Sequence, residues 1–129
     1  MCPIAPYGSW RSPITADLIV AGTIGVGNVN TDGADVYWIE SRPQEGGRSV
    51  LVRRAADGTV ADVTPAPFNV RTRVHEYGGG AYLVAGGVVY FSHFADSRLY
   101  RIAAGGATPE PITTEAALRY ADMELDARR

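Results

Sequence analysis

The chain has 129 residues, of which 46% are hydrophobic and 20% are charged. These values are typical of one globular domain with its own core, and they exclude a disordered chain or a pair of ordinary domains. The formal net charge of −2 argues against nucleic-acid binding, because no basic excess is present to neutralise phosphates. All 12 basic residues are arginine, which we attribute to a bias toward GC-rich codons.

Cysteine content and hydropathy indicate in which cellular compartment the protein is expected. The single Cys2 cannot form an internal disulfide, so the sequence requires no oxidising environment. No basic residue precedes Arg11 and no sustained apolar stretch follows it, unlike a signal peptide. The most apolar window, residues 18–27, has about ten residues, whereas a membrane-spanning helix needs about 20. We therefore expect a cytoplasmic protein without a membrane partner.

The first half of the chain predicts short strands separated by strong turn signals. Residues 1–13 contain several prolines and predict an irregular lead-in segment. We predict a strand over 14–26 and a turn in the Asn- and Gly-containing stretch 28–33. Residues 36–39 are β-branched and aromatic, as expected of a buried strand. Further strands are predicted over 49–54 and 60–64, with turns at 42–47 and 57–58.

The second half repeats this order after three consecutive glycines, Gly78, Gly79 and Gly80. The predicted strands are 81–84, 88–92, 98–103 and 111–113, and the predicted turns are 86–87, 95–97 and 105–106. The similarity is visible letter by letter, because residues 51–58 align with 99–106 at a displacement of 48 positions. The segments 36–38 and 63–64 similarly match 89–91 and 112–113.

A period of about 50 residues with four short strands in each unit is the pattern of a β-propeller. We predict an all-β fold made of antiparallel four-stranded blades, with about two blades and the start of a third. The first blade is predicted over 14–68 and the second over 69–114. Residues 115–129 are predicted to begin a third blade or to form a terminal helix.

The glycine run marks the junction between the two predicted blades. Three glycines in a row weaken any strand or helix, so we expect the backbone to bend sharply there or to touch a neighbouring element. Glu76 lies next to this structural turn, with Arg71 and Arg73 before it. Glu76 and Arg73 are our candidate substrate-binding residues, facing a central channel. The alternative is that Glu76 only pairs with an arginine at the blade junction.

Other motifs give little support for catalysis, cofactors or metals. Ser92, His93 and Asp96 contain the letters of a catalytic triad but lie within five residues, and triad partners usually come from separate elements. The glycines at 22–27 lack the third glycine and the helix of a dinucleotide-binding loop. Two histidines and Cys2 provide no metal-ligand spacing. We expect no cofactor, no metal and no catalytic residue in this chain.

Several segments resemble the amino-terminal β-propeller of serine peptidases of the prolyl oligopeptidase family (S9). They are HEYGGGAY at 75–82, VYFS at 89–92, SRLYR at 97–101, PIT at 111–113, RYAD at 119–122 and the opening YGSWRSPI at 7–14. The likeness is greatest to bacterial members called dipeptidyl aminopeptidase or acylaminoacyl-peptidase-like. It covers nearly the whole chain.

The resemblance implies a propeller of about seven blades that caps an α/β-hydrolase domain and limits the access of bulky substrates. The peptide substrate would then be a partner through that absent domain, and this part alone would be inactive. Open blade faces and strand edges predict marginal stability and self-association of the isolated chain. The alternative is a freestanding small β-protein that acts as a binding or scaffold module.

Overall fold

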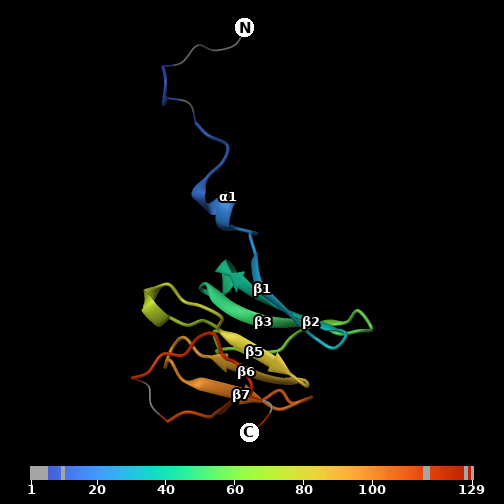
Figure 1. The fold of residues 1–129 in the computed structure, drawn as a ribbon. Coiled ribbons are helices and arrows are strands. Elements are labelled where there is room, and N and C mark those ends of the chain that lie inside the picture. The colour runs from blue at the N-terminus through green and yellow to red at the C-terminus, as the bar shows by residue number, and fades with distance from the viewer. Residues whose placement is uncertain (1–5, 10, 115–116, 127, 129) are drawn as a thin grey trace.

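The fold consists of two four-stranded antiparallel sheets that pack against each other (Figure 1). The computed structural model describes residues 6–9, 11–114, 117–126 and 128. The first sheet contains β1 (Gly25–Asp32), β2 (Asp35–Arg42), β3 (Arg48–Arg54) and β4 (Val60–Asp62). The second contains β5 (Tyr82–Ala85), β6 (Val88–Ser92), β7 (Leu99–Ile102) and β8 (Glu110–Pro111). The predicted all-β class with four-stranded blades is confirmed.

Within each sheet the strands are hydrogen-bonded in sequence order, and the two sheets do not close into a ring. Each strand pairs with the next through a short connection, which is the simplest way to build an antiparallel sheet. The two sheets fall inside the units predicted over 14–68 and 69–114. The exact boundaries of those units stay a prediction.

The core lies between the sheets. In β2, Tyr37 and Ile39 are buried while Trp38 between them is partly exposed, which is the alternation of a strand with one covered face. In β6, Val89 and Phe91 face the same core. The other members of this core are Leu51, Val70, Ala81, Tyr82, Val84, Tyr100 and Ile102.

Polar groups join the sheets at the edge of this core. The Tyr82 hydroxyl donates to the carbonyl of Asn28 at 2.5 Å and lies 3.2 Å from the carbonyl of Tyr37. The Asp32 carboxylate accepts from the amides of Gly86 and Gly87 at 3.2 and 2.6 Å. Since Asp32 ends β1 and the two glycines form the β5–β6 turn, a side chain of one sheet fixes a turn of the other.

The predicted strand over 14–26 is wrong. Its first part forms the short helix α1 (Ala16–Val20), which Thr15 caps by accepting a hydrogen bond from the amide of Leu18 at 3.1 Å. α1 lies away from the sheets in Figure 1 and is tied back by Gln44, whose side-chain amide donates to the carbonyl of Ala21. A local cap therefore outweighs the strand-like composition.

The predicted turn at 28–33 is also misplaced, because most of these residues belong to β1. Asn28 has a positive φ of 50°, and the pairing of β1 with β2 shifts register between Gly27 and Asn30. A bulge of this kind lets turn-forming residues lie inside a strand. The true turn follows Asp32.

The last strand is shorter than expected, and the start of a third blade over 115–129 stays a prediction. The closing strand predicted over 111–113 is β8, Glu110–Pro111. The described residues of 115–129 form neither a strand nor a helix, and Asp122 has a φ of 53°. Within the described part of the chain, no helix has the length and apolarity that crossing a membrane requires. Cys2 lies outside the described residues.

Candidate functional site

The connection between the sheets reverses direction at residues 73–80. A short 3₁₀ helix, Val74–Glu76, is interrupted at His75, where φ is 52°, and Glu76 follows with φ of 63°. Gly78 and Gly79 continue with φ of 94° and 155°, which favours glycine over other residues. Four positive φ values within five residues turn the chain sharply before β5 begins.

Close contact with the 119–122 segment also requires glycine at positions 79 and 80. A Cβ on Gly80 would lie 2.9 Å from Oδ1 of Asp122, and a Cβ on Gly79 would lie 2.9 Å from the Cβ of Ala121. The amide of Gly80 donates to Oδ1 of Asp122 at 2.8 Å, and the amide of Asp122 donates to the carbonyl of Gly80 at 2.8 Å. The 119–122 segment therefore packs directly on the glycine backbone.

Arg119 completes this contact and pairs with Glu76. Its guanidinium group donates to the carbonyl of Arg73 at 2.9 Å and to the Glu76 carboxylate. The partner of Glu76 is thus Arg119, 43 positions further along the chain, and neither Arg71 nor Arg73. Hydrogen bonding to Arg119 lowers the pKa of Glu76, and the charge of Arg73 acts in the same direction.

The lowered pKa makes a prediction for acid stability. A carboxyl whose pKa is lower in the folded than in the unfolded state stabilises the fold when the pH is above the unfolded-state pKa. This stabilisation is lost as the pH falls through the pKa of the folded state. We expect wild type to be more stable than Glu76→Gln near pH 7. The difference should disappear as the pH falls below about 4, the usual range of a glutamate pKa.

Urea unfolding of both proteins between pH 7 and pH 2.5 measures this difference. Arg119→Gln is the matched control, since Glu76→Gln should cost little in that background. A constant difference across the whole pH range would contradict a role for the ion pair. Because 71% of the Glu76 side chain is exposed, we expect the effect to weaken in high salt.

Arg71 and Arg73 lie against the aromatic ring of Phe94, in the turn that follows β6. Their guanidinium carbons are 4.8 and 4.6 Å from the centre of the Phe94 ring. The backbone arranges this contact, because the amide of Arg71 donates to the carbonyl of Ser92 and the amide of Phe94 donates to the carbonyl of Asn69.

Sequence reasoning missed Phe94, Arg119 and Asp122. Only the RYAD segment at 119–122 pointed to the last two.

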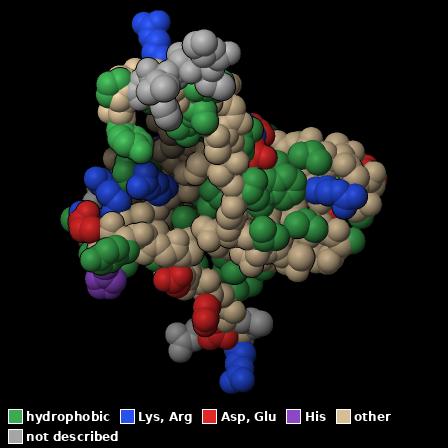
Figure 2. All heavy atoms as spheres, turned by 90° about the horizontal axis from the view of Figure 1, so that it is seen from above, with side chains coloured by type: hydrophobic (Ala, Val, Ile, Leu, Met, Phe, Trp, Pro, Cys, Tyr) green, Lys and Arg blue, Asp and Glu red, His purple; other side chains and the backbone are tan. Residues whose placement is uncertain are grey.

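A groove of about 340 Å³ lies beside this junction. β1 forms one wall, and the connection from Val70 to Ala81 forms the other. Its lining consists of glycines, small or hydroxyl-bearing residues and a few aliphatic side chains, with Arg71 and Tyr77 as the large polar members. The full lining is Gly25, Val26, Gly27, Asn28, Ile39, Ser41, Ser49, Val70, Arg71, Thr72, Tyr77, Gly78, Gly79 and Ala81. On the face seen in Figure 2, basic side chains gather close to acidic ones and to a histidine.

The triad letters at 92–96 do not form a catalytic relay. The buried Ser92 hydroxyl has no hydrogen-bond partner among the described residues. His93 Nδ1 instead accepts from the amide of Asn69 at 3.1 Å, and Asp96 accepts from the Tyr100 hydroxyl at 2.7 Å. No three His, Cys, Asp or Glu side chains of the described chain come together as metal ligands.

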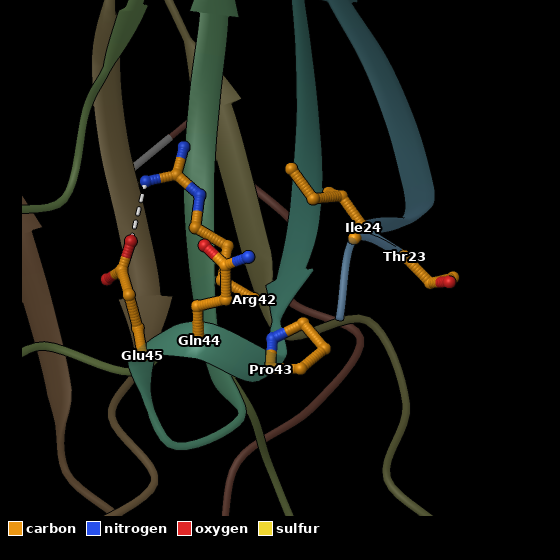
Figure 3. A pocket seen from close by; sticks show the side chains of 7 residues that line it. Thr23, Ile24, Arg42, Pro43, Gln44 and Glu45 are labelled. Carbon is orange, nitrogen blue, oxygen red and sulfur yellow. Dashed lines mark hydrogen bonds and ion pairs between the residues drawn. The ribbon is translucent and has the colours of Figure 1, made fainter. Parts of the chain in front are cut away.

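A smaller hollow of about 110 Å³ lies where β2 ends, between residues 22–24 and 42–45 (Figure 3). Arg42 dominates its chemistry and donates to Glu40, Glu45 and Asp62 at 2.7 to 3.1 Å. Hydrogen bonding to Arg42 lowers the pKa of Asp62. Since the guanidinium group is already held by three carboxylates, we interpret this hollow as structural.

No protein-family model matches the chain, and no curated protein matches it. Solved structures do match it. Puromycin hydrolase is 42% identical with a TM-score of 0.81, over 96% of this chain and 21% of that chain. A mutant of that enzyme complexed with PGG gives the same values. A puromycin-hydrolysing peptidase of Mycobacterium tuberculosis is 40% identical, with a TM-score of 0.81, over 96% of this chain and 20% of that chain.

These matches support the peptidase connection that the sequence segments predicted. The chain spans about a fifth of the length of the structures that it matches. In sequence and in fold, it is therefore similar to one part of a puromycin-hydrolysing peptidase.

Proposed function

We propose that this chain is a non-catalytic β-propeller part of a serine peptidase of the prolyl oligopeptidase (S9) type. Its role is to gate or dock peptide substrates for an α/β-hydrolase domain that these residues do not contain. The observation that carries the proposal is the 42% identity over 96% of the chain to puromycin hydrolase. The proposal extends to the dipeptidyl aminopeptidase or acylaminoacyl-peptidase kind and to a cytoplasmic location.

The groove supports the docking role. Its volume of about 340 Å³ is within the range of ligand sites, roughly 300 to 1,000 Å³. Backbone amides and carbonyls of β1 and of the 78–79 turn are the kind of groups that bind an extended peptide. Glu76 and Arg73, beside this groove, remain our candidate substrate-binding residues.

A chimera tests the proposal. This chain replaces the corresponding fifth of puromycin hydrolase, and puromycin hydrolysis is measured with the chimera and with the isolated chain. We expect hydrolysis by the chimera and none by the isolated chain. Arg73→Gln and Glu76→Gln in the chimera should raise KM with little change in kcat, because they act in docking. Arg54→Gln, at an exposed position of β3, is the control.

Two results would overturn the proposal. Turnover by the purified isolated chain would make it an enzyme by itself. A folded but inactive chimera, together with an isolated chain that is a stable monomer, would favour the freestanding binding or scaffold module. We expect the isolated chain to self-associate instead, since Val26, Val29 and Val60 expose apolar surface on the two edge strands of the first sheet.

A further inference from the structure

Arg71 and Arg73 place two positive charges at one aromatic ring. Thr72 between them is buried, and both arginines are exposed, so the two side chains leave the backbone toward solvent. Both guanidinium carbons lie over the Phe94 ring, at 4.8 and 4.6 Å from its centre. Cation–π contact with a single ring restricts both side chains before any ligand arrives.

In the described part of the chain these two guanidinium groups form no ion pair, and the charge of Arg73 acts on Glu76 only without direct contact. The ion pairs of that part involve Arg42, Arg48, Arg53 and Arg119, and neither Arg71 nor Arg73 takes part in one. The nearest candidate by sequence, Glu76, is bound to Arg119. Arg119 also holds the carbonyl of Arg73 at 2.9 Å, which fixes the backbone of the pair.

Two restrained guanidinium groups on one ring, neither of them in an ion pair of the described chain, are suited to an anion. The planar fork of arginine matches the oxygens of a carboxylate or a phosphate and can donate two parallel hydrogen bonds to either. Arg71 also lines the groove of about 340 Å³, so an anion held there would have room for the rest of its molecule.

We propose that Arg71 and Arg73, held by Phe94, form an oxyanion-binding site at the edge of this groove, for a ligand that carries a carboxylate or a phosphate group. This site depends on charge and geometry alone and does not require the peptidase proposal. The buried Ser92 hydroxyl is not part of the site.

The test uses the 129-residue chain, dilute enough to limit the self-association expected above, in about 0.15 M salt, where nonspecific attraction between charges is screened over about 8 Å. Three small probes are titrated and followed by NMR: inorganic phosphate, N-acetylglycine and the neutral N-acetylglycinamide. We expect saturable shifts of the Arg71 and Arg73 side-chain resonances with at least one of the two anions, and none with the amide. The anion with the lower Kd shows whether the site prefers a phosphate or a carboxylate group.

Variants separate a built site from general positive charge. Arg71→Gln and Arg73→Gln should each raise the Kd of the bound anion roughly tenfold. Phe94→Leu should raise it by a smaller factor, because it keeps both charges and removes only their restraint. Arg54→Gln removes the same charge from an exposed position of β3 and should leave the Kd unchanged.

Equal weakening by all three arginine variants would overturn the proposal, because the anion would then respond only to net charge. An absence of saturable shifts with both anions in wild type would also overturn it. That second result needs no variant to fold.

Discussion

Replacing Phe91 by alanine is expected to lower the free energy of unfolding by about 3–5 kcal/mol. Phe91 is fully buried (0% exposed) in β6, at the centre of the packing between the sheets. Its ring stacks on Tyr100 with centroids 5.6 Å apart, and it meets Phe68 edge-on at 5.8 Å. Alanine leaves a cavity that these neighbours cannot fill, since both rings are held by other contacts.

Urea unfolding followed by circular dichroism measures this loss. Small domains are stable by only about 5–15 kcal/mol, so a loss of this size should move the unfolding midpoint to a much lower urea concentration. Phe94→Ala is the matched control, because Phe94 is only partly buried and should cost much less. Similar losses for the two phenylalanines would show that the interface between the sheets is not the main source of stability.

Gly79→Ala is expected to cost about 1–3 kcal/mol and to detach the 119–122 segment. The new Cβ would lie 2.9 Å from the Cβ of Ala121 and 2.9 Å from Oδ2 of Asp122. The φ of 155° at this position adds backbone strain that no side-chain movement relieves. The hydrogen bonds between Gly80 and Asp122 should break as the segment moves.

Hydrogen exchange at the amide of Asp122 reports this detachment, because that amide donates to the carbonyl of Gly80. We expect faster exchange in Gly79→Ala than in wild type, with the exchange of β6 amides changed far less. Gly22→Ala is the control, since a Cβ there meets nothing within 4 Å. Unchanged protection of Asp122 would show that the segment does not depend on the glycine backbone.

The arrangement of the strands could be predicted because it depends on local patterns. β-branched and aromatic runs alternate with turn residues, and the two halves match at a displacement of 48 positions. The predictions failed where a local feature, a helix cap in one place and a bulge in the other, decided the structure. Thr15 caps α1 within an apolar stretch that was predicted as a strand, and a bulge at Asn28 keeps turn-forming residues inside β1.

The candidate site was less predictable because its contacts join distant parts of the chain. The glycine run indicated a junction, and the structure gives both a sharp turn and a close approach there. Neither Asp122 nor Arg119 follows from any spacing near Glu76, since they arrive from more than 40 positions away. Phe94 was unpredictable for the same reason, because its contact with Arg71 depends on strand pairing.

The bond between Asp32 and the Gly86–Gly87 amides has a consequence for exchanging modules between relatives. A blade transplanted by itself would carry either the carboxylate or the turn that needs it, and the recipient would have to supply the other half. A graft that keeps this contact therefore has to carry both Asp32 and the Gly86–Gly87 turn.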